Sequence, residues 1–192
     1  MKVTCILTAN ELGPEKSDLI VFPEGASQKD MEHAQSSRTD TIIVGAFEDN
    51  GYSRGVLLHR GKNRINYLKV DADNKTEGSG DVKQMPLYEF EDMCIGVLIC
   101  KDIDNEGISH AVVANIRSSP ANLKLLCIPA DMGSHWFNDS SLPFPEKFRG
   151  IQVILCNHIK SHQARGKGLL TDAQGKKIVV QQDMEPIYAE LP

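Results

Sequence analysis

Two stretches of this chain place reactive side chains at the ends of apolar runs. The stretch Asp18–Gly25 is an apolar run that ends in the carboxylate of Glu24. The stretch Cys94–Asp102 is a second apolar run, in which Cys100 opens a polar segment. A thiol at such a junction can be exposed and activated, unlike a thiol in the middle of a strand. A carboxylate and a thiol are groups that general acid–base and nucleophilic catalysis use.

A basic and a second acidic side chain stand between these two stretches. Lys69 follows Tyr67 and Leu68, and Glu77 comes next in a polar loop over residues 71–81. Each group alone also has an ordinary structural interpretation, because a lysine at a strand end is usually solvated and a free cysteine is more often a small buried side chain. The latter interpretation is favoured for the cysteines within apolar runs, namely Cys5, Cys94, Cys127 and Cys156.

The elements that must position these groups are mostly strands. Short apolar and β-branched runs, separated by turn residues, predict strands, several of them covered on both faces. They are Val3–Thr8, Asp18–Phe22, Thr41–Ala46, Arg54–His59, Arg64–Val70, Cys94–Cys100, Leu123–Pro129, Gln152–Asn157, Gly168–Thr171 and Lys177–Gln181. Asp49–Gly51 and Gly61–Asn63 are hairpin-type turns, which make part of the sheet antiparallel. Helical patterns cover Ser27–Gln35, Gly107–Ser118 and Pro145–Ile151. Together they predict a layered α/β fold with mixed sheets.

Length, charge and composition exclude several classes of protein. The 192 residues predict a single domain over residues 1–192, and the net charge of −5 does not suit a general nucleic-acid binder. Apolar runs of strand length are too short to span a bilayer, and the first residues lack a secretory pattern. Five cysteines without metal-ligand spacing indicate reduced thiols. We therefore expect a cytoplasmic protein with no metal, no nucleic acid and no membrane partner.

Taken in order, these motifs resemble the nitrilase superfamily of carbon–nitrogen hydrolases. The resemblance rests on Phe22-Pro23-Glu24, Lys69, Glu77 and Leu98–Asp102, in that order and at similar spacing. It continues in Cys156-Asn157, which resembles a late strand of the family. The segment from Gly168 onward resembles the closing hairpin of the family. The resemblance covers most of the chain and implies an α-β-β-α sandwich of mixed sheets.

Two departures from the family pattern stand out. Only Ala9–Ser17 separate the first strand from the strand of Glu24, so we expect an outer helix to be missing and apolar sheet to be exposed. Lys101 stands where an aromatic residue is frequent in the family. These departures leave the substrate open.

The resemblance implies a role for each reactive group. Cys100 would be the nucleophile, and Glu24 would carry protons from the thiol to the leaving amine and from water. A protonated Lys69 cannot act as a base, so it would face the oxyanion together with the backbone N–H of Lys101. Glu77 would hold Lys69 charged and oriented. No cofactor is needed.

The family pattern also suggests a substrate pocket and an assembly. We expect Lys101, His135 and Trp136 to bind a small-molecule substrate, which would be an amide, a carbamoyl compound or a nitrile. The resemblance further suggests a homodimer in which the sandwiches of two subunits stack.

Two other interpretations stay open at this point. The chain could keep the fold without catalysis and serve as a binding or assembly module. Alternatively, Cys100 could pair with a histidine, for which His110, His158 and His162 are candidates without a favoured spacing.

Overall fold

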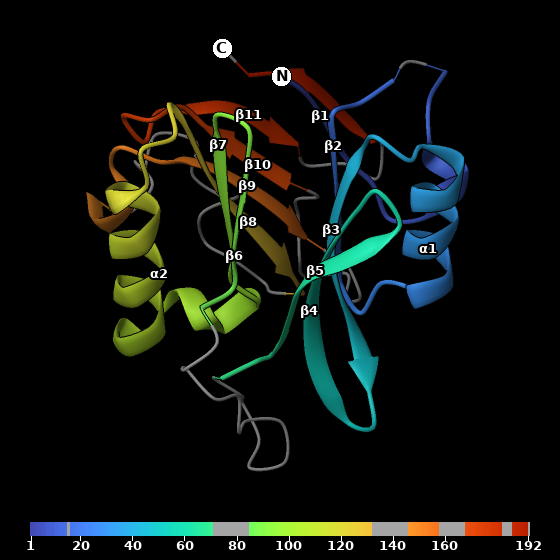
Figure 1. Ribbon diagram of the computed structural model, residues 1–192, viewed down its shortest axis with the longest axis horizontal. Helices are drawn as coiled ribbons and strands as arrows, with labels where there is room; N and C mark the ends of the chain where they lie inside the picture. The colour runs from blue at the N-terminus through green and yellow to red at the C-terminus, as the bar shows by residue number, and fades with distance from the viewer. Residues whose placement is uncertain (15, 71–84, 132–145, 158–167, 182–185, 192) are drawn as a thin grey trace.

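The computed structural model describes residues 1–14, 16–70, 85–131, 146–157, 168–181 and 186–191. Within this part of the chain, two six-stranded sheets lie face to face, and one α-helix lies on the outer face of each sheet (Figure 1). The α-β-β-α sandwich implied by the family resemblance is therefore confirmed.

The first sheet positions two of the reactive groups. In spatial order it contains β12 (Ile187–Glu190), β1 (Lys2–Cys5), β2 (Leu19–Glu24), β3 (Ile42–Asp49), β4 (Tyr52–His59) and β5 (Lys62–Leu68). β1, β2 and β3 are parallel, whereas β4 and β5 each reverse direction. Because two reversals restore the original direction, β2 and β5 end at the same edge of the sheet. Glu24 is the last residue of β2, and Lys69 follows β5 directly.

The second sheet has a related arrangement. In spatial order it contains β11 (Lys177–Gln181), β10 (Gly168–Thr171), β9 (Gln152–Asn157), β8 (Leu123–Ala130), β7 (Met93–Val97) and β6 (Leu87–Phe90). β7, β8 and β9 are parallel and the outer strands are antiparallel, so both sheets are mixed, as predicted.

The central strands are apolar on successive residues because both of their faces are covered. In β2, Leu19 and Val21 belong to the large core that includes the facing sheet, whereas Ile20 and Phe22 pack in a second core beneath the outer helix. This alternation between two cores explains why the run lacks the polar residues of a half-exposed strand.

In the described part of the chain, two α-helices form the outer layers. α1 (Gln28–Ser37) begins after Ser27, whose side chain accepts a hydrogen bond from the Asp30 backbone N–H. α2 (Glu106–Ser118) begins after Asn105, which caps Ile108 in the same way. None of the described helices is both long enough and apolar enough to cross a membrane.

The connection from β1 to β2 contains only the short 3-10 helix η1 (Ala9–Glu11) among its described residues. The expected exposure of apolar sheet does not follow at this strand. Val3 and Cys5 point into the core, so the alternating Lys2 and Thr4 occupy the outer face, where Thr4 Oγ1 lies 2.6 Å from Ser17 Oγ. A polar outer face explains why the described part of β1 exposes no apolar sheet.

Several details differ from the sequence-based expectations. β6 and β12 lie outside the predicted strands: β6 is short and forms a hairpin with β7, and β12 pairs with β1, which is distant in the sequence. The region expected to be helical over Pro145–Ile151 holds the 3-10 helix η3 (Glu146–Phe148), with residue 145 outside the described part. The second hairpin turn lies at Arg60-Gly61, where both residues have positive φ. β7 ends at Val97, before Cys100.

Candidate active site

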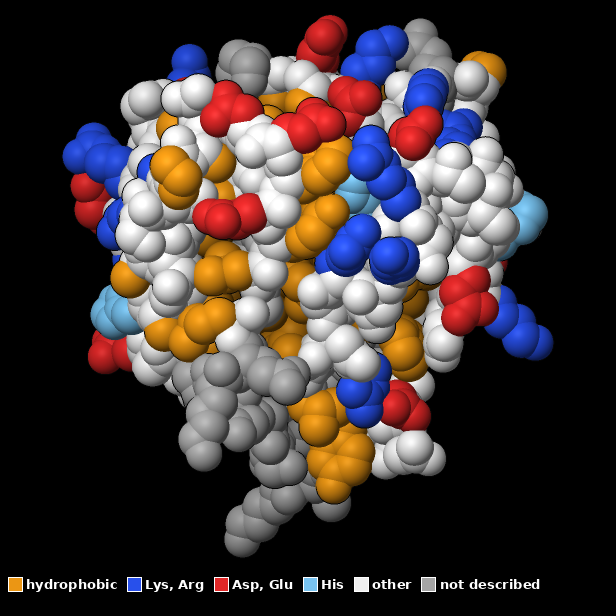
Figure 2. Space-filling model, viewed as in Figure 1, with side chains coloured by type: hydrophobic (Ala, Val, Ile, Leu, Met, Phe, Trp, Pro, Cys, Tyr) orange, Lys and Arg blue, Asp and Glu red, His pale blue; other side chains and the backbone are white. Residues whose placement is uncertain are grey.

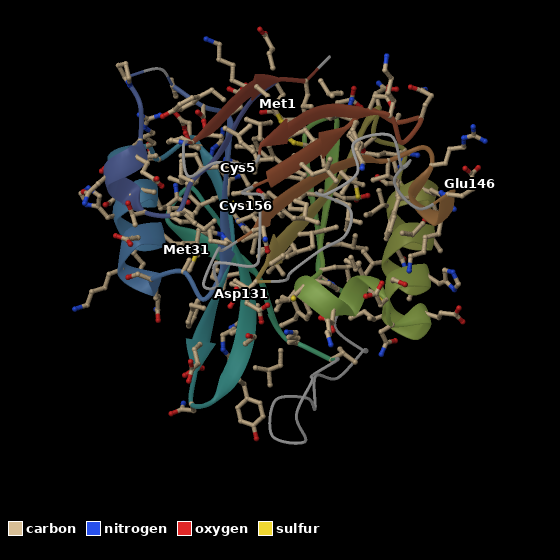
Figure 3. The ribbon with its side chains drawn as sticks, turned by 180° about the vertical axis from the view of Figure 1, so that it is seen from behind. Met1, Cys5, Met31, Asp131, Glu146 and Cys156 are labelled. Atoms are coloured by element: carbon tan, nitrogen blue, oxygen red, sulfur yellow. The ribbon has the colours of Figure 1, made fainter. Side chains whose placement is uncertain are left out.

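The reactive groups meet at the carboxyl ends of strands from both sheets. In such sheets, side chains that follow parallel strands face a crevice at one edge. Glu24 ends β2, Lys69 follows β5, Cys100 follows β7 and Asp131 follows β8. Figure 3 shows Asp131 at this end of the sandwich, between strands of the two sheets.

Glu24 and Lys69 form a buried ion pair. Lys69 Nζ lies 2.9 Å from Glu24 Oε1, and the two residues are only 6% and 8% exposed, respectively. Ser53 Oγ donates a second hydrogen bond to the same oxygen at 2.5 Å. Two donors on one oxygen compensate part of the cost of burying the carboxylate charge.

Cys100 stands on a tight turn between β7 and α2. It begins the 3-10 helix η2 (Cys100–Ile103) and has a φ of 47°, in the left-handed region that side chains rarely adopt. The turn is closed by the Asp102 N–H, which donates to the Ile99 carbonyl at 2.9 Å. A strained backbone at a reactive residue is typical of functional sites.

The charges around Cys100 act in opposite directions. Burial and the neighbouring Glu24 carboxylate raise the pKa of the Cys100 thiol to about 12, whereas Lys69 and the backbone N–H of Asp131 favour the thiolate. Glu24 is thus a close electrostatic neighbour of the Cys100 thiol. At neutral pH the resting group is therefore a thiol whose proton has a carboxylate acceptor beside it.

Lys69 remains a cation in this environment. Burial by itself would lower its pKa, but the interaction with Cys100, the negative charge of Glu24 and the hydrogen bond to Glu24 together raise it. A side chain that stays protonated cannot accept a proton from the thiol. Lys69 can therefore act only as a donor and a positive charge.

Asp102 ties the turn of Cys100 to the strand of Lys69. Its carboxylate accepts a hydrogen bond from the Val70 N–H at 3.0 Å and from the Tyr67 hydroxyl at 3.3 Å. Asp102 and Tyr67 are buried, and burial together with the Asp102 charge raises the pKa of Tyr67 well above its usual range. Sequence reasoning included Asp102 in a motif but gave it no role.

The structure places the remaining sequence candidates as follows. Lys101 is half-buried beside Cys100, and His110 is an exposed residue of α2. Glu77, His135, Trp136, His158 and His162 lie outside the described residues. Sequence reasoning missed Ser53 and the Asp131 N–H, because their approach depends on strand register and on a backbone group. Among the described residues, no three His, Cys, Asp or Glu side chains cluster as metal ligands would.

Comparisons with known proteins identify the architecture. No family model and no curated protein matches the sequence. An amidase from Nesterenkonia sp. matches with a TM-score of 0.75 at 14% identity, over 100% of this chain and 90% of that one. The NitN amidase from Nesterenkonia sp. AN1 gives 0.74 at 15% identity, over 100% and 93%.

A third structure supplies the family description. It is a cysteine-to-alanine variant of the Nesterenkonia AN1 amidase from the nitrilase superfamily, with a TM-score of 0.73 at 15% identity over 100% of this chain and 90% of that one. Another structure of that amidase, a glutamate-to-glutamine variant, shows acrylamide added at its active site cysteine. The chain described here has the fold of the nitrilase-superfamily amidases.

Proposed function

We propose that this protein hydrolyses the C–N bond of a small amide through a covalent acyl-cysteine intermediate. One observation carries the proposal: the buried carboxyl group of Glu24 pairs with the Lys69 ammonium at 2.9 Å and lies near the Cys100 thiol, whose pKa its charge raises. Nucleophile, proton carrier and positive charge thus share one buried site. The fold shared with amidases supports the same reaction class.

In the first step, Cys100 attacks the amide carbonyl carbon. The S–C bond forms as the thiol proton moves to Glu24, and the carbonyl π electrons move to oxygen. Because burial and Glu24 raise the pKa of the thiol to about 12, a base must take the proton during attack. Such a positioned base typically contributes about 10²–10⁴-fold to the rate.

The negative oxygen of this intermediate needs stabilising donors. The Lys69 ammonium and the backbone N–H of Lys101 are the groups proposed to face it. Loss of one donor to such an oxyanion typically costs about 2.7–4 kcal/mol of transition-state stabilisation.

The remaining steps return the protons. Glu24 gives its proton to the leaving nitrogen as the C–N bond breaks, which releases an amine or ammonia and leaves an acyl thioester on Cys100. Glu24 then takes a proton from water, whose oxygen attacks the thioester. Breakage of the S–C bond releases the carboxylic acid, and the sulfur regains its proton.

Four further roles complete the proposal. Glu77 would orient Lys69, and Lys101, His135 and Trp136 would contact the substrate. Carbamoyl compounds and nitriles are alternative substrates for the same groups. The primary-amide class has additional support, because a variant of the Nesterenkonia amidase was solved in complex with butyramide.

The proposed function is tested by ammonia release from a panel of short aliphatic amides, N-carbamoyl compounds and nitriles. We expect release that disappears in Cys100→Ala, while the circular dichroism spectrum of this variant matches the wild type. Cys94→Ala is the matched control, since Cys94 is also buried but lies within β7. Release that survives Cys100→Ala, or no release from any compound, contradicts the proposal. The latter result favours a binding module.

Self-association and a cytoplasmic location remain part of the proposal. A recess of about 650 Å³ lies between α1 and the outer face of the first sheet, and Met31, Phe47, Val56 and Leu58 supply its apolar part. Such a recess suits burial by another copy of the chain. We expect a homodimer in analytical ultracentrifugation, and a monodisperse monomer would contradict this part of the proposal.

A further inference from the structure

Ser53, on β4, contacts both charged residues of the ion pair with different atoms. Its hydroxyl donates to Glu24 Oε1 at 2.5 Å, and its backbone carbonyl accepts a hydrogen bond from the Lys69 N–H at 2.9 Å. The first contact lies at the short end of the range of about 2.5–2.7 Å that is usual for a hydroxyl on a carboxylate. One residue therefore touches the side chain of Glu24 and the backbone of Lys69.

These contacts make the two oxygens of Glu24 unequal. Oε1 accepts from both Ser53 and Lys69, at 2.5 and 2.9 Å. A proton placed on Oε1 would have to displace one of these donors, whereas a proton on Oε2 would disturb neither of them. A carboxyl group anchored in this way cannot rotate freely, so its second oxygen keeps one orientation.

We propose that Ser53 is a positioning residue that holds Oε1 of Glu24, so that Oε2 alone carries the proton between Cys100, the leaving nitrogen and water. This inference rests on the proposed function and adds a division of labour between the two carboxylate oxygens. Ser53 acts through Glu24 and takes no part in any bond that forms or breaks in the substrate.

The backbone contact of Ser53 supports the same role. Lys69 follows β5, and its N–H is held by β4 through the Ser53 carbonyl. Arg54, the next residue of β4, donates hydrogen bonds to Asp49 of β3 at 2.9 Å and to Asn66 of β5 at 2.7 Å. The backbone at Ser53 is therefore fixed from both neighbouring strands, and its hydroxyl is presented to Glu24 at a defined place.

The test compares Ser53→Thr with Ser53→Val in the full chain. Threonine and valine have nearly the same shape and both suit a strand, so the two variants differ mainly in the hydroxyl. Since hydrogen bonds to charged groups are among the stronger ones, we expect Ser53→Val to lower kcat by about 10- to 100-fold and to change KM little. Ser53→Thr should retain kcat within about 3-fold of the wild type, because it keeps the donor.

A pH profile separates positioning from loss of stability. Removing a donor to a carboxylate favours its protonated form, so the acidic limb of kcat/KM should move to higher pH in Ser53→Val but not in Ser53→Thr. Ser119→Ala is the matched control, because Ser119 Oγ donates to Glu89 Oε1 at 2.6 Å in a second half-buried hydroxyl–carboxylate pair, away from the site. It should leave both kcat and the pH profile unchanged.

The outcomes distinguish the two proposals. A wild type without Cys100-dependent ammonia release overturns the proposed function itself. An active wild type with equal kcat in Ser53→Val and Ser53→Thr overturns only the role of Ser53. If Ser53→Val does not fold, Ser53→Ala replaces it in the same comparison, and an unchanged acidic limb in that variant counts against the role.

Discussion

The Lys69 ammonium lies 2.9 Å from Oε1 of Glu24, and the charge of the same carboxylate raises the pKa of the nearby Cys100 thiol. The ion pair is buried, and it joins the ends of two strands that are separated by two others in the first sheet. The two residues are therefore brought together by the fold and not by proximity in the sequence. Its consequences for reactivity and stability can be measured separately.

Glu24→Gln should separate thiol ionisation from turnover. The Glu24 charge raises the pKa of Cys100, so its removal should move the pH midpoint of Cys100 alkylation downward. Turnover should nevertheless fall by about 10²–10⁴-fold, because the proton carrier is lost. Iodoacetamide alkylation with peptide mapping and ammonia release measure the two quantities. Unchanged turnover would favour a histidine as the base.

Lys69→Met should destabilise the fold as well as stop the reaction. It leaves the buried Glu24 charge without its ammonium partner, and breaking a buried pair typically costs about 3–5 kcal/mol. The Lys69→Met/Glu24→Gln double variant removes the unpaired charge and should regain part of the unfolding free energy while remaining inactive. Urea denaturation at neutral pH measures both variants.

The exposed pair between Arg149 and Glu146 provides the control for this experiment. Its side chains are 65% and 78% exposed, and exposed pairs contribute about 0–1 kcal/mol, so Arg149→Met should change stability little. If Lys69→Met and Arg149→Met lower the free energy of unfolding by the same amount, breaking the buried ion pair carries no larger penalty than breaking an exposed one, which would contradict this prediction.

Alkaline pH should weaken the fold through Cys100. Burial and Glu24 raise its pKa from 9.0 to about 12, so the folded protein keeps a proton that the unfolded chain gives up near pH 9. The resulting stability is present below pH 9 and is lost as the pH rises toward 12, by at most about 1.4 kcal/mol per pH unit. Cys100→Ala lacks this group. Over this range the unfolding free energy of the wild type should therefore fall relative to that of Cys100→Ala. A difference between the two proteins that does not change with pH would contradict the raised pKa.

Gly55→Ala should disturb the site from a distance. A Cβ atom at position 55 would lie 2.5 Å from Tyr67 Cε1 and 3.1 Å from Ile99 Cδ1. Tyr67 hydrogen-bonds Asp102, and Ile99 precedes the nucleophile, so both neighbours help to place the Cys100 turn. We expect a loss of about 1–3 kcal/mol in stability together with lower kcat.

The control for this substitution is Gly107→Ala on α2. Its new Cβ would meet only Asn105 Oδ1, at 3.3 Å, and alanine is the better helix former. Gly107→Ala should therefore leave both the free energy of unfolding and kcat nearly unchanged. Full activity in Gly55→Ala would show that the packing of Tyr67 and Ile99 does not govern the site.

The layered fold could be predicted from sequence because local patterns carry it. The run before Glu24 is apolar on successive residues, and the two cores on either side of β2 are the physical reason. The ends of the apolar runs can also be read from the sequence and indicate Glu24, Lys69 and Cys100, although the strands themselves end at different residues, as β7 does at Val97. The pairing of β12 with β1 joins the two ends of the chain, and no local pattern indicates such a contact.

The finer parts of the site depend on register and backbone geometry. Ser53 reaches Glu24 because β4 lies beside β3 in a particular register, and a serine in a strand gives no sign of this by itself. Asp131 acts through its backbone N–H, which any residue type would supply. The raised pKa of Cys100 follows from burial and from a charge distant in sequence. These features follow from tertiary structure alone.

The central claim is that Cys100 forms the covalent bond to the substrate. The most direct measurement is acid quenching of the wild-type protein during turnover of an amide that releases ammonia, followed by mass spectrometry of the intact chain and its peptides. The account predicts an added acyl mass on the peptide of Cys100, and none in Cys100→Ala. An acyl mass on another residue would contradict the claim. So would turnover that persists in Cys100→Ala and leaves no acylated chain.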